Sequence, residues 1–123
     1  MSEEPLRAVM IGVGGYGANT LSALIASPLI ELAAVADRDG AAAAAAGSEA
    51  GCPHYTDNRR ALVEARPRAA FVAIPPAAAA EVIRLALGHR LAVWTEAPLG
   101  ADLAQAVGLC RQAEEARCLL AVA

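Results

Sequence analysis

The sequence predicts an α/β fold, in which helices cover both faces of a doubly wound parallel sheet of six strands. The first observation is an alternation: short apolar runs and segments of helical periodicity follow one another along all 123 residues. Parallel neighbours need a crossover connection, and a helix supplies it. The second observation is composition, since 57% of the residues are hydrophobic and 19% are charged, which favours a packed core over disorder.

The first half of the chain holds three predicted strands and two predicted helices. Pro28 ends the first helix because proline cannot continue one, and Asp39 is placed to cap the second. The apolar character of nearly every position in residues 30–36 is typical of a strand covered on both faces. We expect strands over residues 6–11, 30–36 and 54–55, and helices over residues 16–25 and 40–50.

The second half repeats the alternation three times. Pro67 ends one predicted helix and Pro75 ends the strand that follows it. Leu103, Val107 and Cys110 share one face of the last predicted helix. We expect helices over residues 56–65, 77–87 and 102–117, and strands over residues 69–74, 91–95 and 118–122.

A glycine motif follows the first predicted strand directly and opens the first predicted helix. It reads Gly12-Val13-Gly14-Gly15-Tyr16-Gly17 and satisfies G-x-G-x-x-G in the context that dinucleotide binding requires. Gly12 permits the tight turn, Gly14 lets the backbone approach a diphosphate, and Gly17 lets the helix pack close to the strand. The backbone N–H groups and the positive dipole end of the helix then bind the diphosphate. A glycine-rich turn without a ligand is the alternative. The motif predicts a Rossmann-type sheet with strand order 3-2-1-4-5-6.

Asp37 and Arg38 stand at the end of the second predicted strand, about 20 residues beyond the motif. A carboxylate at this place accepts hydrogen bonds from the adenosine ribose hydroxyls and repels a 2′-phosphate, whereas a guanidinium accepts that phosphate. We therefore expect NAD as the cofactor and leave NADP open. An ordinary turn residue is the alternative for Asp37.

With its strand ends located, the chain resembles the N-terminal domain of the glucose–fructose oxidoreductase and inositol dehydrogenase (Gfo/Idh/MocA) family. The resemblance implies an NAD(P)-dependent oxidation or reduction of a sugar, polyol or related carbonyl compound. It also implies cofactor contacts by Gly15, Tyr16, Ile74, Pro75, Pro76, Glu96 and Pro98. The matching stretches are the glycine motif, Val35-Ala36-Asp37-Arg38, Ala73-Ile74-Pro75-Pro76 and Thr95-Glu96-Ala97-Pro98.

Two positions depart from the family pattern. Members usually have a lysine near the nicotinamide where this chain has Ala97, and many have a histidine where it has Ala79. General acid–base help is worth about 10²–10⁴ in rate, so catalytic residues stay unassigned. Glu96 is a weak candidate, with a solvated or helix-capping carboxylate as its alternative. The bond before Pro98 is a candidate for the cis isomer.

The family also carries a C-terminal substrate domain, which we expect to be absent from residues 1–123. The chain is then a single dinucleotide-binding domain, inactive alone, with a small-molecule substrate only if a second domain exists. A non-enzymatic dinucleotide-sensing module is the second hypothesis, and a structural or dimerisation unit without ligand is the third. A homo-oligomer is left open.

Composition and charge limit the classes of binding partner and the cellular location that we expect for the chain. The net charge is −3, the ten cations are all arginine, and there is no basic stripe, which argues against nucleic-acid binding. No apolar run approaches the ~20 residues that cross a bilayer, and the acidic, polar start of the sequence favours the cytoplasm. Three irregularly spaced cysteines do not predict disulfides or a metal site. His54 and His89 lack sequence partners and are interpreted as surface or structural residues.

Overall fold

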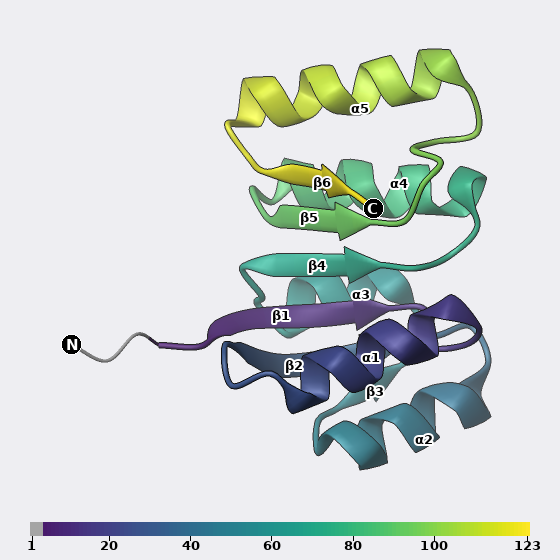
Figure 1. Ribbon diagram of the computed structural model, residues 1–123, viewed down its shortest axis with the longest axis vertical. Coiled ribbons are helices and arrows are strands. Elements are labelled where there is room, and N and C mark those ends of the chain that lie inside the picture. Colours follow the sequence, from purple (N-terminus) through teal and green to yellow (C-terminus); the bar gives the residue numbers. More distant parts are fainter. Residues whose placement is uncertain (1–3) are drawn as a thin grey trace.

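The computed structural model describes residues 4–123, and within them six parallel strands form one sheet in the order β3-β2-β1-β4-β5-β6. The predicted sheet and its strand order are therefore confirmed (Figure 1). The strands are β1 (Leu6–Ile11), β2 (Ile30–Ala36), β3 (His54–Tyr55), β4 (Ala69–Val72), β5 (Ala92–Thr95) and β6 (Leu120–Val122). The helices are α1 (Tyr16–Ala26), α2 (Gly40–Ala50), α3 (Asn58–Glu64), α4 (Pro76–Gly88) and α5 (Leu103–Ala116).

Successive side chains of the central strand β1 point to opposite faces of the sheet and belong to two separate hydrophobic cores. Val9 and Ile11 of β1 belong to the larger core, which contains residues of α3, α4 and α5. Met10 points to the other face and packs in a smaller core with residues of α1 and α2. Each such fully buried aliphatic side chain stabilises the fold by about 1.5–3 kcal/mol. Two cores hold the sheet between its helix layers and fix where the strand ends lie.

Several element boundaries differ from the predicted ones for local reasons. Helix α3 begins at Asn58 because Asp57 is its N-cap, and the Asp57 carboxylate accepts a hydrogen bond from the Arg59 N–H. Helix α4 begins at Pro76, a residue earlier than predicted, because proline is pre-organised for the first turn of a helix. Strand β4 ends at Val72 and β6 begins at Leu120. The carboxyl ends of the strands thus open into short loops, where the predicted site residues lie.

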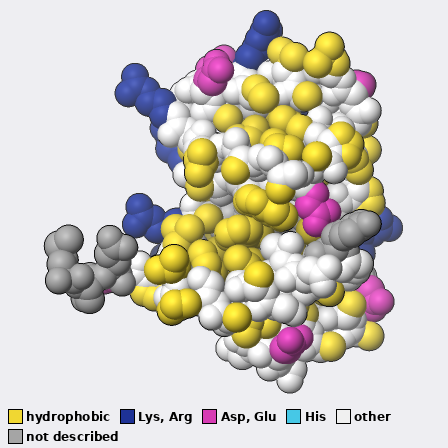
Figure 2. All heavy atoms as spheres, viewed as in Figure 1, with side chains coloured by type: hydrophobic (Ala, Val, Ile, Leu, Met, Phe, Trp, Pro, Cys, Tyr) yellow, Lys and Arg dark blue, Asp and Glu magenta, His cyan; other side chains and the backbone are white. Residues whose placement is uncertain are grey.

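Half of one sheet face carries no helix. Helices α1 and α2 lie in front of β1, β2 and β3 in Figure 1, whereas no helix of residues 4–123 lies in front of β4 and β5. Phe71 and Trp94 are half-buried on this surface, with ring centroids 5.9 Å apart. Figure 2 shows hydrophobic side chains gathered across the middle of the same view. This half of the sheet face is therefore an apolar surface on which no helix of residues 4–123 packs.

Candidate functional site

The glycine motif forms the turn between β1 and α1, and two of its glycines are required by the packing. Gly12 has φ of +87°, and a Cβ on it would overlap the carbonyl oxygen of Ala73. A Cβ on Gly17 would lie 2.5 Å from the carbonyl oxygen of Gly12. In contrast, a Cβ on Gly14 would meet nothing within 4 Å. Gly12 and Gly17 therefore serve the fold, whereas Gly14 leaves an open backbone surface at the mouth of the turn.

Helix α1 starts without a side-chain cap. Gly15 precedes it with φ of 56° and offers no side chain to its first N–H groups. Uncapped N–H groups together with the helix dipole make an anion site, the property that diphosphate binding uses. Tyr16 is the first residue of the helix. Its side chain lies outside the part of the chain that the structure describes.

Asp37 lies beside the glycine turn, as the strand order requires. Its Oδ2 accepts a hydrogen bond from the Val13 N–H at 3.0 Å, and its Oδ1 accepts one from the Asp39 N–H at 2.9 Å. A carboxylate has about four acceptor positions, so each oxygen keeps capacity for a further donor. The carboxylate is thus oriented by the backbone and is still able to accept from a ligand.

A cavity of about 450 Å³ joins the predicted residues at the carboxyl ends of the strands. Gly12, Gly14, Asp37 and Arg38 line it on the side of β1 and β2. Ile74, Pro75, Ala77 and Ala78 give it an apolar wall from the loop after β4 and the start of α4. This is the edge at which open α/β sheets bind ligands. A bare glycine backbone, an oriented carboxylate and an apolar wall fit a dinucleotide.

A second hollow, of about 220 Å³, adjoins the first and shares Ala73, Ile74 and Pro75 with it. Gly17, Pro76, Glu96, Ala97 and Pro98 also line it. The Ala97–Pro98 peptide bond is cis, and the Ala97 N–H donates to the carbonyl oxygen of Ala123 at 2.7 Å. The structure therefore brings Glu96 and Pro98 together with the glycine turn at one edge.

Ala97 and Ala79 lie in different environments. Ala97 is exposed at the smaller hollow, so a longer side chain would fit there. Ala79 is 3% exposed and belongs to the larger core, and it lines neither hollow. Of the two alanines, only Ala97 lines the smaller hollow.

Asn58 also lines the 450 Å³ cavity, although it was not among the predicted site residues. It follows β3, a strand of two residues, after Thr56 and Asp57. The signal was available, because polar residues after the ends of parallel strands meet at one edge of the sheet. The predicted site residues follow the first, second, fourth and fifth strands, and none of them follows the short third strand.

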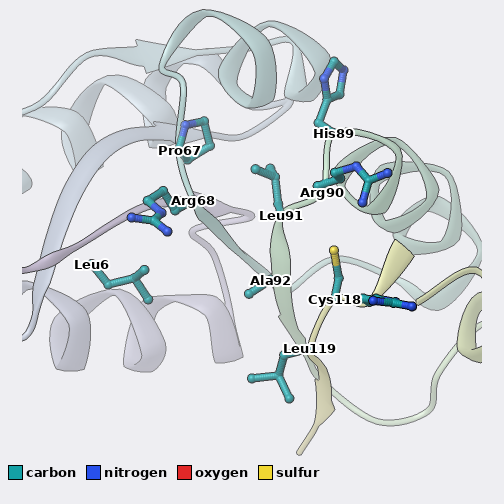
Figure 3. Close-up of a pocket in the computed structure, with 10 residues that line it drawn as sticks. Leu6, Pro67, Arg68, His89, Arg90, Leu91, Ala92, Cys118 and Leu119 are labelled. Atoms are coloured by element: carbon teal, nitrogen blue, oxygen red, sulfur yellow. The ribbon is translucent and has the colours of Figure 1, made fainter. Parts of the chain in front are cut away.

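A further cavity, of about 490 Å³, lies at the opposite edge of the sheet and contains none of the predicted site residues. Leu6 and Ala92, the first residues of β1 and β5, line it. Figure 3 shows Arg68 and Arg90 on opposite sides of Leu91 in this cavity. The cavity lies at the amino ends of the strands, whereas α/β sheets of this type bind ligands at the carboxyl ends. Among residues 4–123 there is no group of three metal-ligating side chains, and none of the helices there is long and apolar enough to span a bilayer.

The fold and the site together define a dinucleotide-binding domain. Comparison with known families agrees: residues 6–123 match the family described as "Oxidoreductase family, NAD-binding Rossmann fold" (GFO_IDH_MocA). The chain therefore belongs to the Gfo/Idh/MocA oxidoreductase family, and the predicted resemblance is confirmed. A search of curated proteins found no match to the chain.

Solved structures of the same kind cover nearly all of this chain. A 3-ketoreductase, KijD10 from Actinomadura kijaniata, solved with NADP and TDP-benzene, is 31% identical over 97% of this chain and 37% of its own length, with a TM-score of 0.89. GenD2 from gentamicin A biosynthesis, solved with NAD, is 27% identical. The match covers 98% of this chain and 34% of GenD2, with a TM-score of 0.91. UDP-N-acetylglucosamine 3-dehydrogenase from Acidithiobacillus ferrooxidans is 25% identical. The match covers 98% of this chain and 38% of the dehydrogenase, with a TM-score of 0.87. The chain thus spans just over a third of the length of these relatives.

Proposed function

We propose that this chain is the NAD(P)-binding domain of an oxidoreductase that acts on a sugar, polyol or related carbonyl compound, and that it is inactive in isolation. The observation that carries the proposal is the placement of the open Gly14 backbone and the oriented Asp37 carboxylate on one cavity. Relatives solved with NAD and with NADP support the cofactor class. Relatives whose names specify a 3-ketoreductase and a UDP-N-acetylglucosamine dehydrogenase support a sugar-type substrate.

In this proposal, the two hollows hold different parts of the cofactor. Gly14 and the start of α1 would hold the diphosphate, and Asp37 would accept hydrogen bonds from the adenosine ribose hydroxyls. The smaller hollow, with Glu96, Ala97 and Pro98, would take the nicotinamide end. When bound, the nicotinamide supplies hydride transfer. Arg38 lines the same cavity as Asp37, which keeps NADP as a second cofactor.

Proton transfer is the part of the chemistry that this chain supplies poorly. The methyl group of Ala97 can neither donate nor accept a proton, and residues 1–123 contain no lysine. General acid–base help contributes about 10²–10⁴ in rate. Glu96 is the remaining ionisable residue of the smaller hollow and is the candidate for any proton transfer by this domain.

A second domain is the proposed source of substrate contacts. The solved relatives are almost three times as long as this chain, which covers 34–38% of three of them. The apolar surface of β4 and β5 with Phe71 and Trp94 offers a place for such a domain to pack.

We propose a cytoplasmic location, supported by the three free cysteines, since thiols persist in reducing compartments.

Isothermal titration of the chain with NAD, NADH, NADP and NADPH tests the cofactor assignment. The expected result is saturable binding with NAD tighter than NADP, together with no oxidation of NADH when a keto sugar is added. Absence of heat with all four dinucleotides at millimolar concentration would remove the binding function. Steady NADH oxidation by the isolated chain would contradict its proposed inactivity.

A dinucleotide sensor without catalytic activity is the second candidate function. It is favoured by the combination of an intact cofactor cavity with an alanine at position 97. A sensor would change its oligomeric state or its affinity for a partner when NADH replaces NAD. Light scattering of the chain with each ligand separates the two candidates: equal masses with both dinucleotides favour the enzyme domain, and a change in mass favours the sensor.

A further inference from the structure

The side chain of Asn58 carries a polar atom that the fold does not satisfy. Its Oδ1 is buried and has no hydrogen-bond partner in the described part of the chain. Buried carbonyl oxygens are normally paired, and one left unpaired destabilises the fold. An unpaired buried oxygen needs an explanation. At the wall of a cavity, one explanation is that a bound ligand donates the missing hydrogen bond.

Asn58 is held in place by its neighbours in sequence. Asp57 caps α3 and accepts a hydrogen bond from the Arg59 N–H at 2.9 Å, which fixes the backbone on both sides of Asn58. The side chain lines the 450 Å³ cavity and also borders a hollow between α3 and α4. The terminal torsion of asparagine is broad and roughly two-fold, so its carboxamide can turn its oxygen toward the cavity without moving the backbone.

The chemistry around Asn58 identifies which part of a dinucleotide it meets. Gly12 and Gly14 offer bare backbone suited to phosphate, and Asp37 offers a carboxylate suited to ribose hydroxyls. Apart from Arg38, which follows Asp37, the remaining wall is formed by Ala73, Ile74, Pro75, Ala77 and Ala78. These side chains are apolar and suit the flat face of a base. Asn58 supplies the polar group beside this apolar wall.

We propose that Asn58 recognises the adenine of the cofactor through the edge that carries the 6-amino group. The 6-amino N–H donates to Asn58 Oδ1, and Asn58 Nδ2 donates to N7 of the base. Asparagine is the side chain that pairs with adenine at these two positions. This assignment rests on the proposed dinucleotide binding and adds that the cavity selects the base. It also gives the buried carbonyl oxygen its partner.

A change in the ligand tests the proposal without altering the protein. Nicotinamide hypoxanthine dinucleotide carries a carbonyl oxygen in place of the 6-amino group and a hydrogen on N1 of the base, and it keeps N7 and the rest of NAD. Position 6 of this analogue therefore cannot donate to Asn58 Oδ1. The expected result, by isothermal titration of the unmodified chain, is that NAD binds about tenfold more tightly than the hypoxanthine analogue, the discrimination expected of a two-point amide pair. Equal affinities for the two dinucleotides would overturn the role of Asn58 and leave dinucleotide binding intact.

A variant then shows which residue is responsible. In Asn58→Leu, which has a side chain of similar size, the preference for NAD over the hypoxanthine analogue should fall to about twofold or less, since the paired contact is lost. The matched control is Gln112→Leu, because Gln112 lies on α5 and its amide donates to the carbonyl oxygen of Arg84; its preference should stay at about tenfold. An unchanged preference in Asn58→Leu would overturn the proposal. Failure of the unmodified chain to bind either dinucleotide would overturn both this proposal and the proposed function.

Discussion

A hydrogen bond of 3.0 Å joins the backbone N–H of Val13 to Oδ2 of Asp37. It ties the glycine turn after β1 to the residue that follows β2, so the proposed phosphate and ribose contacts share one support. The second carboxylate oxygen accepts from the Asp39 N–H, next to the start of α2. Asp37 therefore has a structural role in addition to its proposed contact with the cofactor.

Replacement of Asp37 by asparagine separates these two roles. One carboxylate oxygen becomes an NH₂ group that cannot accept from Val13 or Asp39, so we expect a loss of stability of about 1–3 kcal/mol. The negative charge that opposes a 2′-phosphate is also lost, and the preference for NAD over NADP should fall. Chemical denaturation and titration with both dinucleotides measure the two effects. An unchanged ratio of NAD to NADP affinity would contradict the assignment of Asp37 to the ribose.

Alanine at two glycines of the motif, Gly14 and Gly17, should have opposite consequences for stability and for NAD binding. A Cβ at position 14 meets nothing within 4 Å, so Gly14→Ala should fold as stably as the unmodified chain and bind NAD more weakly. A Cβ at position 17 would lie 2.5 Å from the carbonyl oxygen of Gly12, so Gly17→Ala should lose about 1–3 kcal/mol of stability through overpacking. Thermal unfolding and NAD titration of both variants give the comparison. Full NAD affinity in Gly14→Ala would show that the diphosphate lies elsewhere.

Asp39 is expected to hold the start of the alanine-rich helix α2. Its Oδ1 accepts hydrogen bonds from the backbone N–H groups of Ala41 and Ala42. Asp39→Ala removes this cap and should cost about 1 kcal/mol. Asp39→Asn, which keeps an acceptor oxygen, is the control and should retain most of the stability. If both variants unfold at the same denaturant concentration as the unmodified chain, the cap does not stabilise the helix.

The three free cysteines should differ in reactivity. Burial raises the pKa of the Cys52 thiol, which lowers the fraction of reactive thiolate at neutral pH. Cys110 is exposed on α5. With iodoacetamide at pH 7.5, Cys110 should be alkylated first and Cys52 more slowly, as peptide mass spectrometry would show. Raising the pH should speed the reaction of Cys52, and faster modification of Cys52 than of Cys110 at pH 7.5 would contradict the burial seen here.

The parts of the molecule that the sequence predicted are those with local signals. Short apolar runs indicated five of the six strands, of which the first ends at Gly12 and the fourth before Pro75, and the G-x-G-x-x-G pattern after the first strand predicted the diphosphate-binding turn. Asn58 was not predicted although it follows a strand end, because β3 has only two residues and gives a weak strand signal. The sequence also did not locate the uncovered surface at Phe71 and Trp94. Periodicity shows that a strand is apolar but does not show whether a helix lies over each part of its sheet.

The most direct measurement of the central claim is a titration of the ¹⁵N-labelled chain with NAD, followed residue by residue in amide NMR spectra. Shifts should be confined to the carboxyl edge of the sheet, with the largest at the backbone amides of Gly12 to Gly17 and at Asp37, and they should saturate with added ligand. Absence of shifts at millimolar NAD would contradict dinucleotide binding. Shifts centred on Arg68, Arg90 and Leu119 would place the ligand in the cavity at the opposite edge and contradict the site described above.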